Sequence, residues 1–327
     1  MDILLITLFL GKPLWLWLTF IALVGALLAF DLGVLHKKNA EIGVAESLKL
    51  SAFYITLGVA FGGFVWLQLG GQAAAEYLTA FVVEKSLALD NVFVIALIFS
   101  YFSIPRIYQH RVLFWGILGV IVLRAIMIGL GATLISHYGW VLYIFAAFLI
   151  FTGAKMLVTN EKTMDLDGNA LLGFLRKRFR VTDQLHGNAF FVRLADSKTG
   201  RAVSYMTPLF LALVLIEIAD LVFAVDSVPA VFAITTDPYI VYTSNIFAIL
   251  GLRALYFALA AVLHRFAYLK QALAVLLVFI GSKVFIADFA GLEKFPAAWS
   301  LSITFAILAA GIFYSLWRTR DGAASHS

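Results

Sequence analysis

Residues 83–92 (VEKSLALDNV) and 216–229 (IEIADLVFAVDSVP) place acidic side chains inside otherwise apolar sequence. The long apolar flanks of both stretches are typical of helices that span a membrane. A carboxylate at membrane depth costs about 2.5–3.5 kcal/mol even on mild insertion scales. These acids therefore need partners, and a bound cation is the most direct one.

The composition indicates a polytopic membrane protein. Hydrophobic residues make up 63% of the 327 residues and charged residues 13%, with a mean hydropathy of +0.98, whereas soluble proteins are about 25% charged. The chain has no cysteine, which excludes disulfides, thiolate metal sites and cysteine nucleophiles. The net charge of +5 lies mostly in loops between apolar segments, so we expect a lipid bilayer as partner and no nucleic acid.

Apolar segments long enough to cross a bilayer recur along the chain. One crossing requires about 20 apolar residues, and this criterion predicts an all-α fold with about nine transmembrane helices. The predicted spans are 14–35, 48–69, 77–101, 112–135, 139–158, 207–233, 241–263, 269–288 and 297–317.

The basic residues predict the orientation of these spans. Most Lys and Arg residues lie in one alternate set of loops, whereas the opposite set holds Lys12 and Lys294. The basic set comprises 36–49, 102–111, 159–206, 264–270 and the C-terminal tail. Because basic loops stay in the cytoplasm, we expect the N-terminus outside and the C-terminus inside.

An internal repeat relates the two acidic stretches. Charged residues are rare inside apolar helices, so their repetition in one order indicates a true repeat. An overlay of the two halves pairs Glu84 with Asp220, Asp90 with Asp226, Asn91 with Ser227, Arg124 with Arg253 and Lys155 with Lys283. The segments 123–125 and 252–254 match, as do 151–156 and 279–284. Lys85 has no counterpart, since Leu221 stands opposite it.

Each repeat holds three spans, an odd number, so the second repeat must enter the membrane from the opposite face. The repeats are therefore inverted, which is a known architecture of transporters with a substrate site near the membrane midplane. The predicted units are two N-terminal scaffold helices (1–76), repeat 1 (77–158), a cytoplasmic loop (159–206), repeat 2 (207–288) and a C-terminal helix with its tail (289–327).

The predicted site is rich in oxygen ligands. The candidate metal ligands are Glu84, Asp90, Asn91, Glu217, Asp220, Asp226 and Ser227. Carboxylates, amides and hydroxyls suit hard cations such as Mn²⁺, Mg²⁺ or Ca²⁺, and the six histidines lie at span ends or in loops. Glu217 and Asp220, three residues apart, share one helix face.

The spacing within each acidic stretch restricts how the acids act. Glu84 and Asp90 are six residues apart, as are Asp220 and Asp226, which places each pair about 120° apart around a regular helix. Either the acids serve different partners or the helix is interrupted. Pro229 offers a reason for an interruption, because it disrupts the turn that contains Asp226.

Basic residues within the spans offer the acids a second set of partners. The candidate ion-pair or gating residues are Arg124, Arg253, Lys155 and Lys283. The possible pairs join Asp90 or Asp226 to an arginine, and Glu84 to Lys85 or Lys283. The acids still outnumber the two deeply placed arginines, because the lysines lie near span ends, where they can snorkel to the surface. The predicted site therefore keeps the negative excess that a cation requires.

Asp31 stands near the predicted cytoplasmic end of the first span. An acid at that depth can reach headgroup water, which makes it an interfacial residue. The alternative is a place in a proton or entry path.

The motifs around these acids resemble those of the TerC/Alx family of integral membrane proteins. The matching segments are 31–33 (DLG), 84–91 (EKSLALDN), 217–229 (EIADLVFAVDSVP) and 252–257 (LRALYF), and the likeness covers residues 14–317. The resemblance implies a multi-pass protein of the bacterial inner membrane linked to manganese export, tellurium resistance and the response to alkaline pH. It also implies kinship with the lysine-exporter superfamily, whose members use two inverted three-helix repeats.

These observations predict a secondary transporter that exports Mn²⁺ in exchange for protons by alternating access. Mn²⁺ is then the substrate, and we expect no permanently bound cofactor. The alternatives are a membrane assembly or metallation factor that docks secretion partners without transport, and an exporter of another cation such as Ca²⁺. We expect no enzyme, because the sequence has no nucleophile with an adjacent base, phosphate loop or histidine-rich metal site.

Overall fold

The computed structural model describes residues 7–35, 43–158, 180–182, 184–195, 202–259, 269–292 and 295–323. Helices dominate this part, because a backbone in lipid must satisfy its own hydrogen bonds. The helices are α2 (Leu14–Leu35), α3 (Val44–Leu69), α4 (Gly71–Tyr101), α5 (Arg106–His137), α6 (Val141–Val158), α8 (Pro208–Phe232), α9 (Pro238–Ile249), α10 (Leu252–Leu259), α11 (Leu269–Phe289) and α12 (Ala297–Ala323). The strands are β1 (Leu8–Phe9), β2 (Lys12–Pro13), β3 (Phe191–Ala195) and β4 (Ala202–Met206).

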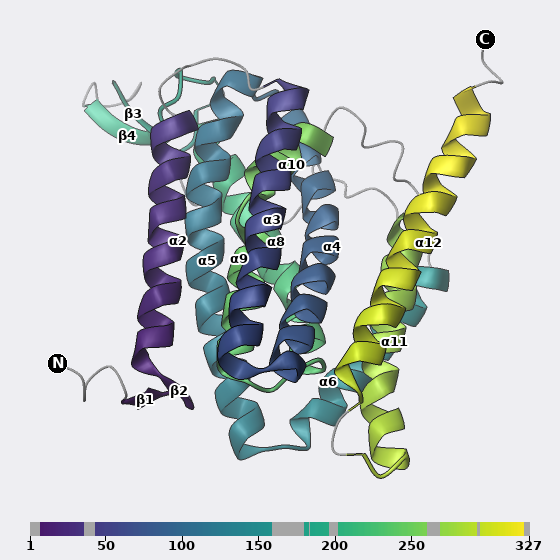
Figure 1. Cartoon of the computed structure of the whole chain (residues 1–327). Helices are drawn as coiled ribbons and strands as arrows, with labels where there is room; N and C mark the ends of the chain where they lie inside the picture. Colours follow the sequence, from purple (N-terminus) through teal and green to yellow (C-terminus); the bar gives the residue numbers. More distant parts are fainter. Residues whose placement is uncertain are drawn as a thin grey trace.

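Eight segments of the described residues are long and apolar enough to cross a membrane, and they match eight of the predicted spans. The remaining predicted span, 77–101, lies in α4, which has 31 residues. This helix is long enough to cross a bilayer but carries Glu84, Lys85 and Asp90 close together. The start of α2 and the end of α12 lie at opposite ends of the bundle (Figure 1), as an odd number of crossings requires.

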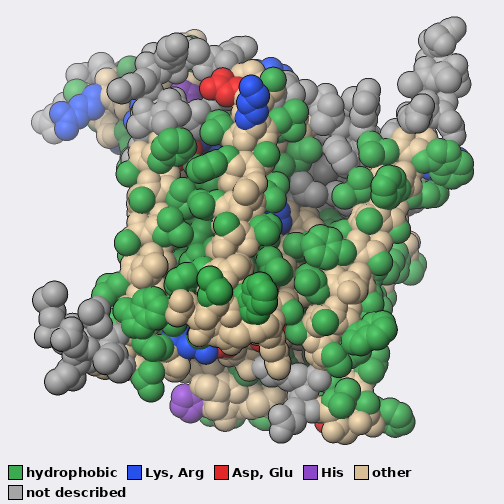
Figure 2. All heavy atoms as spheres, viewed as in Figure 1, with side chains coloured by type: hydrophobic (Ala, Val, Ile, Leu, Met, Phe, Trp, Pro, Cys, Tyr) green, Lys and Arg blue, Asp and Glu red, His purple; other side chains and the backbone are tan. Residues whose placement is uncertain are grey.

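The surface of the molecule carries an apolar band. Figure 2 shows hydrophobic side chains over the middle of one face, while most of the charged side chains on that face gather toward the two ends. Large apolar side chains such as Ile21, Val59 and Trp66 are exposed. Such a surface suits the hydrocarbon core of a bilayer, which is about 30 Å thick.

The helices pack in two groups that lie side by side. α6, α11 and α12 stand beside a bundle of the other helices (Figure 1). Within the bundle α5 packs along α8, and α4 packs along α3, α8 and α9. α12 contacts both α11 and α4, so α4 lies between the two groups.

The contact between α6 and α11 is reciprocal. A Cβ atom on Gly153 would lie 2.6 Å from the carbonyl oxygen of Ala274, and one on Gly281 would lie 2.5 Å from that of Ala146. In the sequence overlay Gly153 matches Gly281, and the same offset matches Ala146 with Ala274. A two-fold axis that exchanges the two helices produces such a pair of contacts. The inverted arrangement of the two repeats stays a prediction, because these contacts do not give the direction of the axis.

The interrupted helix is not the one that contains Pro229. α8 runs through Pro229 to Phe232, because a proline in the last turn removes one hydrogen bond and leaves few residues beyond it to displace. The interruption instead divides the predicted span 241–263 into α9 and α10. Gly251 at this break has a φ of 79°, a left-handed conformation that favours glycine, and a side chain there would overlap with Tyr54.

Part of the predicted loop 159–206 folds into a hairpin. β3 and β4 pair antiparallel, with Phe191 opposite Met206. Thr207 Oγ1 donates a hydrogen bond to the carbonyl oxygen of Ala189 at 2.8 Å, which fixes the hairpin to the start of α8. Residues 176–179 of the basic run lie outside the described residues.

Candidate cation site

Arg124 of α5 lies at the centre of a buried polar cluster. Its Nε and Nη2 atoms donate to the two carboxylate oxygens of Asp220 at 3.1 and 3.2 Å, and such bidentate pairs are stronger than single hydrogen bonds. Its Nη1 atom donates to the carboxylate of Glu84, to Ser227 Oγ at 2.6 Å and to Asn245 Oδ1 at 3.2 Å. All three charged residues are almost fully buried. One guanidinium group therefore serves two carboxyl groups away from water.

The polar residues of α4 and α8 meet crosswise at this cluster. Asn91 Nδ2 donates to Asp220 Oδ1 at 3.0 Å, while Glu84 and Ser227 both accept from Nη1 of the arginine. Seven residues separate the two members on each helix, so each pair occupies one helix face. The sequence overlay exchanges Glu84 with Asp220 and Asn91 with Ser227. Asn91 of α4 therefore lies beside Asp220 of α8, and Glu84 of α4 lies near Ser227 of α8.

Three buried oxygen atoms of α4 and α8 accept no hydrogen bond from any described residue: Glu84 Oε2, Asn91 Oδ1 and Glu217 Oε2. Buried polar atoms rarely stay unpaired, because an unpaired one costs about 1–3 kcal/mol. Oxygen acceptors of this kind are the atoms that hard cations bind. The cluster thus offers ligand atoms that the protein itself does not use.

The predicted ligands do not form a continuous acidic cage in the described part of the chain. No three Asp, Glu or His side chains there gather into a group that could hold a metal ion. The physical reason is the position of Arg124, which stands between Glu84 and Asp220 and binds both. The prediction gave the arginine Asp90 or Asp226 as partner, and the structure gives it these two acids instead.

Glu217 and Asp220 face α5 together, as their three-residue spacing predicts. A Cβ atom on Gly119 would overlap with the carboxylate of Glu217. At Gly116, one turn earlier, an added Cβ would meet Ile216 at an ordinary contact distance of 3.7 Å. Gly119 therefore provides the space that the Glu217 carboxylate occupies.

Asp226 has a different partner from Asp220. Its Oδ1 atom accepts a hydrogen bond from Thr152 Oγ1 of α6 at 3.4 Å. Of the two alternatives that the six-residue spacing left open, the structure has different partners on an uninterrupted helix. The side chain of Asp90 lies outside the described part of the structure, so its role as a metal ligand stays a prediction.

Arg253, the repeat counterpart of Arg124, lies in a second cluster. Its Nη2 atom donates to Asp31 Oδ1 at 2.6 Å, and the Tyr54 hydroxyl donates to the same oxygen at 3.3 Å. Asp31 is buried, so the prediction of an interfacial acid that reaches headgroup water is wrong. The side chains of α3 and α10 enclose it. Its role in a proton or entry path stays a prediction.

The two predicted gating lysines differ in their surroundings. Lys155 is exposed near the end of α6, where it can snorkel as predicted. Lys283 is buried, and its Nζ atom donates to Ser300 Oγ of α12 at 3.0 Å. The prediction that Lys283 reaches the surface is therefore wrong, because α12 covers this side of α11.

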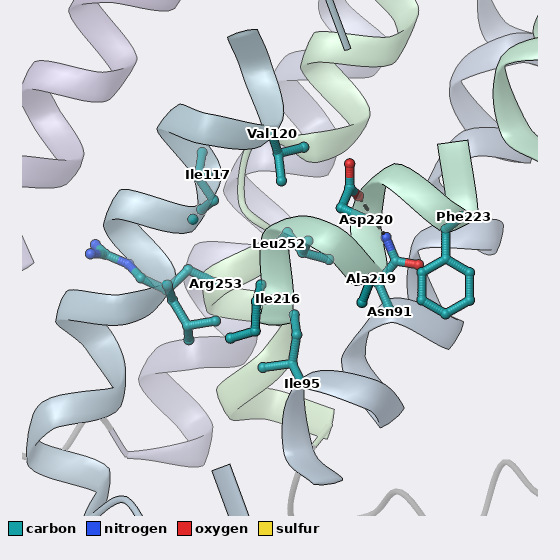
Figure 3. A pocket seen from close by; sticks show the side chains of 12 residues that line it. Asn91, Ile95, Ile117, Val120, Ile216, Ala219, Asp220, Phe223, Leu252 and Arg253 are labelled. Carbon is teal, nitrogen blue, oxygen red and sulfur yellow. Dashed lines mark hydrogen bonds between the residues drawn. The ribbon is translucent and has the colours of Figure 1, made fainter. Parts of the chain in front are cut away.

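A small cavity lies beside the Arg124 cluster. Its volume of about 20 Å³ gives room for one water molecule. Asn91 and Asp220 line it on one side, and the guanidinium group of Arg253 points to the opposite side, away from them (Figure 3). Ile117 and Val120 also line it. These residues of α5 precede Arg124, so the cavity lies on the side of the cluster toward the start of α5.

A second cavity lies toward the other end of the bundle. It has a volume of about 120 Å³ and is lined by residues of α6 and α11, the end of α8 and the segment that follows it, including Thr235, Lys283 and Asp288. Asp220 lines the first cavity and Phe232 the second. Because Ser227 lies between them on α8, the charged cluster separates the two cavities.

Sequence reasoning missed several residues that shape this region. Asn245 accepts a hydrogen bond from Arg124, and Tyr54 donates one to Asp31, the partner of Arg253. A single amide or phenol inside an apolar span gives no repeat signal. Gly119 and Gly251 act through the absence of a side chain. A signal for Gly251 existed, because this glycine stands beside a repeated Leu-Arg-Ala segment whose other copy has valine there.

The fold and the site define a multi-pass integral membrane protein with a charged cluster buried among α4, α5, α8 and α9. Residues 69–323 match the integral membrane protein TerC family. The chain belongs to this family. The matched segment contains Arg124 and all of its polar partners.

The chain is also similar to several curated proteins over almost its full length. An uncharacterized membrane protein of Rickettsia bellii is 49% identical over 92% of this chain and 97% of the relative. An uncharacterized membrane protein of Myxococcus xanthus is 44% identical, with 96% of each chain covered. A protein of Escherichia coli K12 named "Putative membrane-bound redox modulator Alx" is 46% identical over 94% of this chain and 95% of the relative. No solved structure matches the chain.

Proposed function

We propose that this protein is a secondary transporter of a bacterial inner membrane that exports Mn²⁺ from the cytoplasm in exchange for protons. The observation that carries the proposal is the set of unpaired buried acceptors on α4 and α8, namely Glu84 Oε2, Asn91 Oδ1 and Glu217 Oε2. These atoms lie on the same helices as the Asp220 carboxylate. Mn²⁺ prefers such hard oxygen ligands.

Arg124 acts in this proposal as an internal counter-ion. The guanidinium group pairs with both Glu84 and Asp220 while no metal is bound, and its single positive charge offsets one of their two negative charges. A divalent cation that reaches these carboxylates competes with the arginine, because two like charges cannot share them without strong repulsion at short distance. Protons can replace the metal afterwards, since a protonated carboxyl group tolerates burial. The carboxylates are thereby shared in turn by arginine, metal and protons.

The two cavities support a path on either side of the cluster. The smaller one touches Asp220 and Asn91, and the larger one begins near the end of α8. Rocking of inverted repeats against each other exposes a central site alternately to each side. Asp90, Asp226 and Ser227 complete the proposed ligand set, and movement of α4 relative to α8 brings them to the ion.

The name of the E. coli relative suggests a redox function as a second candidate. This chain has no cysteine, so thiol exchange is not available to it alone. We favour ion transport because the unpaired oxygen atoms of Glu84, Asn91 and Glu217 are potential ligands of a cation. The proposal includes no enzymatic activity and no permanently bound cofactor.

The test is a metal-flux measurement in proteoliposomes that contain the purified protein. Mn²⁺, Ca²⁺ and Mg²⁺ are compared under an imposed pH gradient, because Mn²⁺ and Ca²⁺ both take oxygen ligands. We expect Mn²⁺ flux that depends on the proton gradient and disappears in Asp220→Asn. Glu46→Gln, at an exposed acid in the first turn of α3, is the matched control. Absent flux in the unmodified protein, or unchanged flux in Asp220→Asn, rejects the proposal.

A test in cells addresses the remaining predicted ligands. Asp90→Ala and Asp226→Ala are expected to abolish manganese tolerance without loss of membrane insertion. Wild-type tolerance in both variants removes these two residues from the proposed site.

A further inference from the structure

The break between α9 and α10 leaves backbone carbonyl groups inside the membrane-spanning part of the protein. α9 ends at Ile249 and α10 begins at Leu252. The last carbonyl groups of a helix have no partner within it, and lipid supplies none. The span that contains this break is the most buried of the eight candidate spans. These carbonyl groups therefore need a donor or a cation from elsewhere in the protein.

Lys85 of α4 supplies that partner. Its Nζ atom donates to the carbonyl oxygen of Ala248 at 2.8 Å and to that of Leu250 at 3.1 Å. A positive charge at the C-terminal end of a helix is also favoured by the helix dipole. Lys85 follows Glu84 directly, so adjacent residues of α4 bind Arg124 and the carbonyl groups at the end of α9.

Lys85 lies in repeat 1 and the break lies in repeat 2, and the overlay relates α4 and α9–α10 to α8 and α5, which have neither feature. α5 is continuous and carries Val122 where the overlay places Gly251. Leu221 of α8 stands where the overlay places a counterpart of Lys85. The chain thus carries the extra cation only on the helix that packs against the broken one. This match indicates that the charge of Lys85 serves the free carbonyl groups.

We propose that the Lys85 ammonium group is a tethered cation that occupies a monovalent-cation site formed by the main-chain carbonyl groups at the α9–α10 break. In transporters with discontinuous helices, unwound carbonyl groups and helix C-terminal ends bind coupling cations. Lys85 fills this place from within the chain, so the break needs no free alkali ion. Removal of the ammonium group then creates a site for a small free cation. The inference rests on the proposed transport function for its role in the cycle, but its test does not require transport.

The test uses Lys85→Ala, which removes the ammonium group and leaves space for a small amine. Thermal unfolding of the purified protein in detergent is followed in ethylammonium, Na⁺ or tetramethylammonium chloride at equal ionic strength. We expect ethylammonium to raise the unfolding midpoint of Lys85→Ala in a saturable way, because a ligand that binds the folded state stabilises it. Tetramethylammonium has no N–H donor and should not do so. An equal response to ethylammonium and tetramethylammonium overturns the proposal.

Two controls separate a specific site from a general salt effect. Lys155→Ala removes an exposed lysine of α6 and should show no preference for ethylammonium. Lys85→Met removes the charge but fills the space, and should lose stability without rescue. A preference for ethylammonium in Lys155→Ala, or rescue of Lys85→Met, contradicts the proposed site.

If Lys85→Ala does not fold, a second pair of variants tests whether the carbonyl groups at the break need a positive charge. Lys85→Gln keeps N–H donors without a charge, and Lys85→Arg keeps the charge. The proposal expects Lys85→Arg to unfold at a higher temperature than Lys85→Gln. A glutamine variant as stable as the wild type overturns it, because a neutral donor then suffices.

The outcome for this site is distinguishable from the outcome for transport. Specific rescue by ethylammonium together with an absence of Mn²⁺ flux in the wild type keeps the tethered cation and rejects the transporter. Mn²⁺ flux in the wild type without specific rescue of Lys85→Ala by ethylammonium keeps the transporter and rejects the tethered cation.

Discussion

The middle helices of the two repeats carry the same arginine in different surroundings. α5 is continuous and directs Arg124 between α4 and α8, where it binds Glu84 and Asp220. The α9–α10 span is broken just before Arg253, and this arginine binds Asp31 of α2. One arginine belongs to the candidate cation site, and the other joins an N-terminal helix to the second repeat. Equivalent positions in a repeat therefore need not share a role.

The largest expected effect separates the two arginines. Arg124→Met leaves two buried carboxyl groups without their shared partner and should lower the free energy of unfolding by about 3–5 kcal/mol. Arg253→Met removes a group with one carboxylate partner and should cost less. Unfolding in mixed detergent micelles measures both, with Arg106→Met at an exposed arginine as control. If Arg253→Met loses as much free energy of unfolding as Arg124→Met or more, Arg124 is not the arginine with the larger set of buried partners.

The break itself is tested at Gly251. Gly251→Ala forces a side chain into a left-handed backbone conformation, at a cost of about 1–3 kcal/mol, and against Tyr54. The matched control is Gly63→Ala in α3, where an added Cβ meets nothing within 4 Å and the change should be near neutral. The same unfolding assay compares them. Similar stabilities of the two variants would show that the break is not required.

A glycine on the continuous helix tests the site more locally. Gly119→Ala displaces the carboxylate of Glu217 and should reduce Mn²⁺ flux roughly tenfold, which corresponds to about 1.4 kcal/mol of binding free energy. Gly25→Ala in α2, where an added Cβ meets nothing within 4 Å, should keep wild-type flux. Proteoliposome flux is the measurement. Equal flux in both variants removes Glu217 from the ligand set.

The smallest expected effect concerns the second cluster. Tyr54→Phe removes one hydrogen bond of 3.3 Å to Asp31 and leaves the ion pair with Arg253, so it should cost about 0.5–1.5 kcal/mol and leave Mn²⁺ flux unchanged. Tyr138→Phe, at an exposed tyrosine at the end of α5, is the control in the unfolding assay. A strong loss of flux in Tyr54→Phe would place this cluster in the transport site.

Much of the fold followed from the sequence because each prediction rested on a strong local constraint. Apolar segments of sufficient length predicted the spans, since only helices satisfy the backbone of a single segment in lipid. The three-residue spacing of Glu217 and Asp220 predicted their common face correctly. The repeated Arg124 and Arg253 indicated ion-pair partners, but the spacing could not say which acids they bind.

The rest could not be predicted because it depends on contacts between distant helices. Pro229 gave a local reason for a break, whereas the actual break at Gly251 is supported by Tyr54 and by Lys85 from other helices. The position of Lys283 along its span suggested a surface location, and packing of α12 buries it. Arg124 stands between Glu84 and Asp220 and binds both, an arrangement that the spacing along each helix does not give.

The most direct test of the comparison between the arginines is an equilibrium Mn²⁺ titration, followed through the paramagnetic resonance of the free ion. Arg124→Gln and Arg253→Gln are measured beside the wild type. Arg124 competes with the metal for Glu84 and Asp220 in this account, so Arg124→Gln should bind Mn²⁺ more tightly than the wild type, and Arg253→Gln should match the wild type. Unchanged or weaker Mn²⁺ binding by Arg124→Gln would contradict it.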